Sequence, residues 1–467
     1  MADSSASDAP TSRPLGSARR LIAPLALAQF ICSFAGSNMN VMISDITDDL
    51  DTTVKGVQTT ITLFLVIMAI LMIPCSKLTD RWGRKRCFIL GLTLYGIGAL
   101  LSAASPSLGV LILGNSVFEG VGTAFLIPPV YILATLWFDD MTSRAWAFGV
   151  ISGLGGIGAA AGPLIGGIIT SAISWRAAFV FQALVVASII LMSRRLVDPL
   201  PPDPTRPFDA IGAVLSAVGM FFIVFGILQA GSNNTLFAVC LAIGAAFLAA
   251  FFLFIRHRER LGKEPLLSTG LFRNATCNLA LVTQNIQWLL LMGTSFTVSV
   301  FLQEVRGYSA IKTGVIFTAA TAGILVSSLA AERLAKRFPQ RTLIISGFIA
   351  TIAGIVILLF LVRAWDSLAA FVPGLLLIGL GLGGMLTPSV NVVQSSFPEE
   401  RQGEISGLSR SVSNLGSSFG TAIAGTILVS VVASGNRAYA IAMIVLAAFG
   451  LVGLLAAARL PARIERA

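Results

Sequence analysis

Charged residues are scarce in this sequence of 467 residues. Asp, Glu, Lys and Arg together make up 12% of the chain, whereas soluble domains contain roughly a quarter. A soluble chain of this length could not cover its surface with so few charges. Apolar residues account for 55% of the chain, and the mean hydropathy is +0.87. Runs of about 20 apolar residues can cross the hydrocarbon core of a bilayer, so we predict a membrane protein with many spans.

Cysteine and histidine are also rare, which argues against several kinds of site. The single histidine, His257, lies in the basic run RHRER, where contact with solvent or lipid headgroups is a simpler role than catalysis. No ATP-binding loop of the Walker A type occurs. We therefore expect no metal, no cofactor and no enzyme activity. The cysteines are scattered through apolar runs in no metal-binding or disulfide pattern: Cys32, Cys75, Cys87, Cys240 and Cys277.

Hydropathy predicts about fourteen membrane-spanning helices, all α and without strands. Two polar segments, 194–206 and 256–273, divide them into six spans, a two-helix hairpin and six further spans. The predicted spans lie at roughly 21–44, 55–76, 87–105, 108–136, 145–171, 174–193, 208–230, 235–256, 275–303, 309–332, 342–363, 366–396, 403–433 and 437–459.

The cations of the chain indicate which loops face the cytosol. Lys and Arg gather in alternate connections, such as KLTDRWGRKR at 77–86, while the intervening connections are short and poor in cations. By the positive-inside rule the basic connections and both termini are cytosolic. We expect no nucleic-acid partner, because no basic stripe interleaves with aromatic residues. The predicted organisation is a disordered tail (1–20), a six-helix bundle (21–193), linkers with the inserted hairpin (194–274), a second six-helix bundle (275–460) and a short tail (461–467).

Several motifs, in order along the chain, resemble those of the major facilitator superfamily. The loop 77–86 matches its loop signature at Asp80, Arg81, Gly83, Arg84 and Lys85, although Ser76 stands where the signature has glycine. The segment GLGGIGAAAGPLIGG at 153–167 is similar to the Gly-Pro motif of antiporters. WRAAFVF at 175–181, FDAIGAVLSAVG at 208–219 and SGLSRSVSNLGSSFGTAI at 406–423 resemble the fourteen-helix drug:proton antiporter branch.

The resemblance implies that the loop 77–86 is a cytosolic gate between the two halves. Asp80 would lie at the N-terminus of a helix from the other half, where a carboxylate is favourable. Arg81 and Arg84 would reach carboxylates or helix carbonyls, and Gly83 permits a turn with positive φ. Lys85 and Arg86 could instead be cations that only set the topology.

The fifth predicted span has small residues on one helical face. Gly155, Gly158, Gly162 and Gly166 repeat at helical spacing, so this face should pack tightly against a neighbouring helix. Pro163 removes a backbone hydrogen bond and allows a kink. Together with Gly167, this pattern favours a bending helix that seals the cytosolic path, although generic helix packing would use the same residues.

A single acid, Glu119, lies deep in a predicted span. Ionisable residues at this depth are costly and indicate function. Related antiporters usually have arginine at the position of Asn115 and glutamine at that of Glu119, so this chain departs at both. Removal from water favours the neutral form of a carboxyl group, which suits a group that binds and releases a proton. Glu119 is therefore the candidate for proton coupling, and the alternative is a neutral, structural Glu that is hydrogen-bonded to Asn115 or to a facing helix.

Polar stripes in both halves suggest a shared central substrate cavity. Span one has Gln29, Ser33, Ser37, Asn40 and Ser44 on one face. The acid that related antiporters often have near Ala35 is missing. Each polar group could also serve only to bond helices together. The cavity candidates, with two aromatic residues for stacking, are Ser37, Asn38, Asn40, Asn115, Phe118, Gln284, Asn285, Gln287, Trp288, Asn391 and Gln394.

Arg410 lies about two turns into the thirteenth span, on a face with three serines. We expect it to pair with Glu404 near the cytosolic surface, because a long cationic side chain can reach the interface from this depth. The alternative is that it points into the cavity.

The function that these observations favour is secondary active transport in the cell membrane. The resemblance implies alternating access, with proton influx driving the export of drugs or amphiphilic small molecules. A dedicated metabolite or lipid carrier, working as a uniporter or symporter, is the alternative. The expected partners are a small-molecule substrate, protons and membrane lipids, and a monomer is the simplest expectation for the oligomeric state.

Overall fold

The computed structural model describes residues 15–138, 141–205, 207–230, 233–335, 337–365, 367–397, 402–430 and 435–461. Within these residues the regular structure is helical, and no β-strand occurs. In the described part of the chain, thirteen helices are long and apolar enough to cross a membrane. A fourteenth span results if two parts of α7, Gly153–Ala159 and Ala161–Ala172, which meet at 44°, are counted as one. The prediction of an all-helical protein with about fourteen spans is confirmed.

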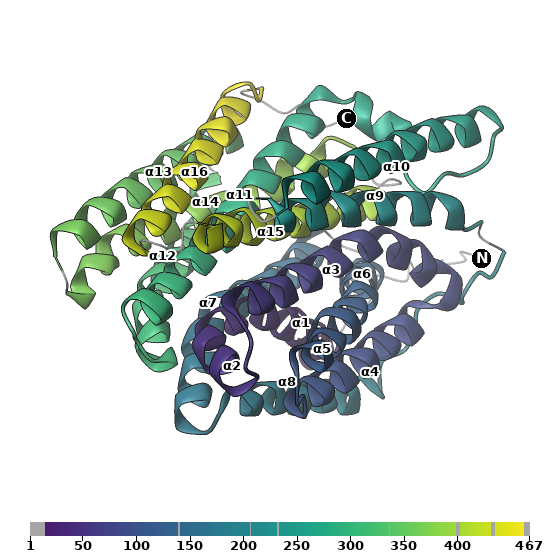
Figure 1. Cartoon of the computed structure of the whole chain (residues 1–467). Coiled ribbons are helices and arrows are strands. Elements are labelled where there is room, and N and C mark those ends of the chain that lie inside the picture. Colours follow the sequence, from purple (N-terminus) through teal and green to yellow (C-terminus); the bar gives the residue numbers. More distant parts are fainter. Residues whose placement is uncertain are drawn as a thin grey trace, which may run out of the picture.

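The first half of the chain forms a bundle in which short helices continue some of the spans. Figure 1 shows this half in purple to blue below the rest of the molecule. Its elements are α1 (Leu15–Asn38), η1 (Met39–Met42), α2 (Ile43–Asp49), α3 (Val54–Trp82), α4 (Arg84–Ala103), α5 (Leu108–Leu111), η2 (Ile112–Glu119), α6 (Gly120–Trp137), α7 (Met141–Ala172) and α8 (Trp175–Ser193).

The second half forms a similar bundle, drawn in green to yellow in Figure 1. The inserted hairpin comes before it and consists of α9 (Ala210–Gln229) and α10 (Asn234–Arg260). The elements that follow are η3 (Thr269–Arg273), α11 (Ala275–Val300), η4 (Phe301–Val305), α12 (Ala310–Ala335), α13 (Gln340–Ala364), η5 (Leu368–Phe371), α14 (Val372–Ser395), α15 (Gln402–Ser430) and α16 (Gly435–Ala458).

Each half has its own apolar core, and helices of both halves meet along two seams. One core consists almost entirely of residues before Val197 and the other almost entirely of residues after Phe208. The two halves meet where α3 packs on α15 and where α7 packs on α12. The division of the chain at residues 193 and 275 stays a prediction. The predicted tails, apart from 15–20 and 461, lie outside the described residues.

The hairpin α9–α10 covers one of these seams. α9 packs against both α3 and α15, and a small apolar cluster joins Val66 of α3, Val224 and Leu228 of α9, and Ala422 of α15. At the start of α9, the buried Asp209 accepts hydrogen bonds from Gly212 N and from Leu266 N of the following linker, both at 3.0 Å. The hairpin is therefore fixed to the bundle by apolar packing, and the buried carboxylate joins its start to the linker that follows it.

The two ends of the bundle differ in their charges. We call the end with the loop 77–86 the Asp80 end. At the opposite end, Trp175 Nε1 donates a hydrogen bond of 3.0 Å to the carboxylate of Asp49, and Arg176 forms an ion pair with it. We call this the Asp49 end. The cation distribution predicts that the Asp80 end faces the cytosol.

Candidate functional site

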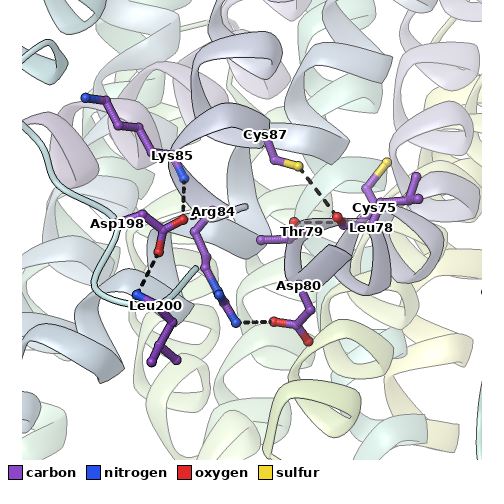
Figure 2. Close-up of polar contacts among 9 residues, drawn as sticks. All are labelled: Cys75, Leu78, Thr79, Asp80, Arg84, Lys85, Cys87, Asp198 and Leu200. Atoms are coloured by element: carbon purple, nitrogen blue, oxygen red, sulfur yellow. Dashed lines mark hydrogen bonds and ion pairs between the residues drawn. The ribbon is translucent and has the colours of Figure 1, made fainter. Parts of the chain in front are cut away.

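The loop after α3 is short and tightly bonded. Gly83 N donates to Thr79 O at 3.1 Å and ends α3, and α4 begins at the next residue. Gly83 has φ of +95°, a conformation that other residues adopt only with strain. Arg84, which is buried, pairs with Asp80 at 2.8 Å. Figure 2 shows this pair beside the start of α4. The turn thus places Asp80, in the last turn of α3, against Arg84 at the start of α4.

A residue of the linker between the halves completes this loop. Asp198 Oδ2 accepts hydrogen bonds from the backbone nitrogens of Arg84, at 2.6 Å, and Lys85, at 3.3 Å (Figure 2). Gly83 has no side chain to satisfy these first N–H groups of α4. The carboxylate therefore caps the helix and interacts favourably with the positive end of its dipole.

The linker makes two further contacts with the loop. Lys85 Nζ donates to Arg194 O at 3.1 Å, and Asp203 N donates to Asp80 O at 3.2 Å. Residues 194–206 were expected to be only a linker, and Asp198 was not among the predicted site residues. The residues directly before α15, 398–401, lie outside the described part of the chain, so the predicted contact of Asp80 with a helix start of the other half stays a prediction.

The glycine face of α7 packs directly on α1. A side chain at Gly158 would collide with Phe30 O, and one at Gly162 would collide with the hydroxyl of Ser37. A Cβ at Gly166 would lie 3.1 Å from that of Asn38. The two helices therefore approach closely along this face, as is common between membrane helices, and at Gly158 a side chain would meet backbone that cannot easily move.

The part of α7 near Pro163 also contacts the other half. A Cβ at Gly167 would lie 2.5 Å from Ala310 O, and one at Gly314 of α12 would lie 2.5 Å from Pro163 O. Ile311 N donates to Ser171 Oγ at 3.0 Å. These contacts lie toward the Asp49 end, whereas the motif was expected to seal the cytosolic path. The bend at Ala160 agrees with Pro163, whose ring removes the hydrogen bond to the carbonyl four residues earlier.

Glu119 is completely buried inside the first bundle. It ends η2, a π-helical segment in the middle of the span. Asn115 Nδ2 donates to Oε2 at 3.3 Å, and Ser102 Oγ of α4 donates to Oε1 at 3.5 Å. A Cβ at Gly98 of α4 would lie 2.7 Å from Glu119 N. The carboxyl group thus points toward α4 of its own half, where the two helix backbones lie close together. It does not point toward the second half.

The surroundings of Glu119 are polar but uncharged. Tyr95 of α4 donates to Gln182 of α8 at 2.5 Å, and both are fully buried. Ser116 Oγ donates to Thr60 O of α3 at 2.7 Å. Among the described residues no Lys or Arg forms an ion pair with Glu119. The carboxyl group therefore has neutral donors on α4 and on its own helix.

Polar residues of span one join the two halves at the Asp49 end. Asn40 Nδ2 donates to Ser295 Oγ of α11 at 3.1 Å. Gln303 of η4 accepts from Ser44 N at 3.2 Å and donates to Asn40 O at 2.8 Å. Ser37 and Asn38, by contrast, pack on α7 of their own half. The stripe therefore divides between contacts within the first half and contacts across the interface.

The polar group of span nine bonds helices within the second half. Ser409 of α15 donates to Gln284 at 2.9 Å, Asn285 donates to Val412 O at 2.9 Å, and Gln287 donates to Leu382 O of α14 at 3.1 Å. Phe118, Trp288, Asn391 and Gln394 are half-buried. Asn115 bonds to Glu119 rather than to this group, so the candidates for a shared cavity do not form one hydrogen-bonded cluster.

Arg410 bonds to Tyr131 and not to Glu404, so the predicted pair of Arg410 and Glu404 is wrong. Its Nη2 donates to Tyr131 OH of α6, and its guanidinium lies 4.9 Å from the centre of that ring. Tyr131 OH in turn donates to Gln29 Oε1 at 3.3 Å. Glu404, the expected partner, instead accepts from Ser268 N at 2.6 Å. The backbone of the linker satisfies this carboxylate, which leaves Arg410 to stack on an aromatic ring of the other half.

Comparison with known proteins decides the family. The family model described as Major Facilitator Superfamily matches residues 25–421 and 280–466. The chain belongs to the major facilitator superfamily. It is a membrane transporter with many spans, and its family relatives are transporters rather than enzymes.

Curated relatives of this transporter are bacterial drug-resistance and efflux proteins. It is 29% identical to the puromycin resistance protein of Streptomyces alboniger over 86% of this chain and 80% of that protein. It is 29% identical to the multidrug efflux pump LfrA of Mycolicibacterium smegmatis over 78% of this chain and 72% of that protein. These relatives agree with a location in the cell membrane.

Solved structures share the fold. A crystal structure of the peptide transporter POT in complex with sulfate has a TM-score of 0.70 and covers 96% of each chain, at 15% identity. A POT family transporter in complex with 5-aminolevulinic acid has a TM-score of 0.67 and covers 94% of this chain and 96% of that one, at 12% identity. At these identities the likeness concerns the fold alone.

Proposed function

We propose that this transporter is a proton-coupled antiporter that exports drugs or amphiphilic small molecules by alternating access. The resistance and efflux proteins among its relatives support this substrate class. We further propose that the Asp80 end faces the cytosol, as its cations indicate.

The observation that carries the proposal is the environment of Glu119. A charged carboxylate without a cation is costly when it is fully buried, and here it has two long hydrogen bonds from neutral donors. A protonated Glu119 fits this environment. The carboxyl group of Glu119 lies where the backbones of α4 and η2 are in close contact. Release of its proton would therefore place a charge between these two helices and disturb their packing. Protonation is thereby linked to the arrangement of helices in the first half.

Two separate sets of contacts between the halves support alternating access. At the Asp49 end, Asn40 and Gln303 provide the hydrogen bonds. Nearer the Asp80 end, Arg410 bonds to Tyr131, and Ser411 Oγ donates to Ala69 O at 2.7 Å. Opening toward one side requires one set to break while the other persists. Such an exchange needs no ATP and can be driven by a gradient of protons.

Proton movement in proteoliposomes tests the proposal. The purified protein is reconstituted with an acidic interior and a trapped pH dye, and a panel of amphiphilic cations and neutral drugs is added outside. We expect alkalinisation of the interior that requires both the protein and a compound. A dedicated metabolite or lipid carrier is the second candidate. Transport that ignores a pH gradient, with no response to the panel, would favour it.

A further inference from the structure

A pocket of about 520 Å³ lies on the surface beside the loop 77–86. It is open to the outside and is separate from the buried cluster around Glu119. One wall comes from the end of α3 and the start of α4, and the other from the proline-rich linker. The lining residues include Arg81, Trp82, Arg86, Leu90, Pro202 and Pro204.

The pocket contains two arginines that have no acidic partner among the described residues. Arg84 pairs with Asp80, and Lys85 donates to the linker backbone. Asp198 is occupied by the first N–H groups of α4. Among the described residues, by contrast, neither Arg81 nor Arg86 has an ion pair or a hydrogen-bond acceptor. Two guanidinium groups in one pocket favour an anionic ligand with several oxygen atoms, such as a phosphate ester.

An exposed apolar track leads from this pocket along the outer face of α4. The exposed residues Arg86, Leu90, Thr93, Ile97 and Leu100 follow one another at spacings of three and four, which is one face of a helix. Leu90 belongs to both the pocket and the track. The track therefore begins at the arginines and continues along the part of α4 that lies within the membrane.

Trp82 marks the height of the pocket relative to the membrane. Its side chain is 44% exposed, and its ring stacks on Phe125 of α6, with the ring centres 6.0 Å apart. Tryptophan with one wet and one apolar side is typical of the membrane–water interface. The neighbouring arginines thus lie at the level of lipid headgroups, where anionic lipids attract basic side chains.

We propose that this pocket binds the headgroup of an anionic phospholipid. Its phosphate lies between Arg81 and Arg86, and an acyl chain follows Leu90, Ile97 and Leu100. A soluble anion would use the arginines but not the apolar track, which is why the lipid is the occupant that fits. The linker wall of the pocket is formed by Pro202 and Pro204, which follow Asp198 in sequence. The hydrogen bonds of Asp198 to the start of α4 therefore hold this wall in place.

Native mass spectrometry of the detergent-purified full-length protein tests this site. Wild type should retain added phosphatidylglycerol and lose phosphatidylcholine. Arg81→Gln/Arg86→Gln should reduce retention of phosphatidylglycerol about tenfold or more. The matched control Arg194→Gln/Arg195→Gln removes the same charge at the same end, from exposed positions outside the pocket, and should retain the lipid. Arg86→Gln alone, at an exposed position, should give an intermediate loss without affecting the fold.

The variant Asp198→Ala distinguishes lipid binding in a formed pocket from simple attraction between charges. The substitution removes a negative charge, so attraction alone would increase retention of phosphatidylglycerol, whereas loss of the linker wall should lower it. Equal losses in both double arginine variants, equal retention of the two lipids, or higher retention in Asp198→Ala would overturn the proposal. Glycerol 3-phosphate that binds as tightly as the lipid would overturn it in favour of a soluble anion.

Discussion

Asp198 Oδ2 lies 2.6 Å from the backbone nitrogen of Arg84, so a residue between the two halves caps the helix that follows the signature loop. The first turn of α4 cannot cap itself, because Gly83 has no side chain and adopts a positive φ. The loop that the superfamily resemblance identifies as a gate is thus joined to the segment that connects the two bundles. Movement of one half relative to the other would act on this contact.

Replacing Asp198 should weaken the protein at this point. Loss of a helix cap costs about 1 kcal/mol, so Asp198→Ala should lower the thermal unfolding temperature in detergent and slow transport. The exposed acid Glu264 of the second linker provides the control, and Glu264→Gln should change neither quantity. Unfolding by tryptophan fluorescence and uptake in proteoliposomes measure the two effects. Equal behaviour of both variants would mean that the cap contributes nothing.

Gly83 should not tolerate a side chain. Its φ of +95° is strained for any other residue, at a cost of about 1–3 kcal/mol, so Gly83→Ala should destabilise the protein. Gly153, in the helix α7, has nothing within 4 Å of an added Cβ, and Gly153→Ala should be neutral or slightly stabilising. Thermal unfolding of the two variants side by side checks this prediction.

The contact between α7 and α1 should depend on single glycines rather than on overall helix propensity. A Cβ at Gly158 collides with Phe30 O, whereas one at Gly156 meets nothing within 4 Å. Gly158→Ala should therefore cost about 1–3 kcal/mol, and Gly156→Ala should not. The two positions are in the same helix two residues apart, so a loss of stability in both variants would contradict close packing as the cause.

Arg410 and Tyr131 should be energetically coupled across the halves. A hydrogen bond to a charged group contributes about 1.5–3 kcal/mol, and the guanidinium also stacks on the ring. In a double-mutant cycle with Arg410→Gln and Tyr131→Phe, the two losses of stability should be non-additive by about 1 kcal/mol or more. Tyr308→Phe in place of Tyr131→Phe is the control and should give additive losses. Additivity in both cycles would show that the contact does not couple the halves.

Much of the fold could be predicted because it follows from local patterns. Runs of apolar residues give the spans, and the polar segments at 194–206 and 256–273 separate the hairpin from the bundles. The glycine spacing in 153–167 indicated a tightly packed face, and α7 has one on α1. Each of these features is encoded within about 20 consecutive residues.

Contacts between distant residues could not be predicted in the same way. Nothing in the sequence around Asp198 indicates that it reaches the start of α4, 114 positions away. Arg410 was expected to pair with Glu404 because its side chain can reach the membrane interface from its depth in the span. In the structure Arg410 instead bonds to Tyr131, and Glu404 accepts a hydrogen bond from the linker backbone. Glu119 was found from its depth alone, while its direction was hidden because η2 is π-helical and departs from the usual helical spacing.

Compound-dependent proton flux in Glu119→Gln proteoliposomes tests the central claim most directly. Glutamine keeps the size and the hydrogen bonds of the protonated acid but cannot release a proton. We predict that the flux falls to the level of protein-free liposomes while the variant stays folded, and that Glu304→Gln, which alters an exposed acid in η4, behaves as wild type. Wild-type proton flux in Glu119→Gln would contradict the account.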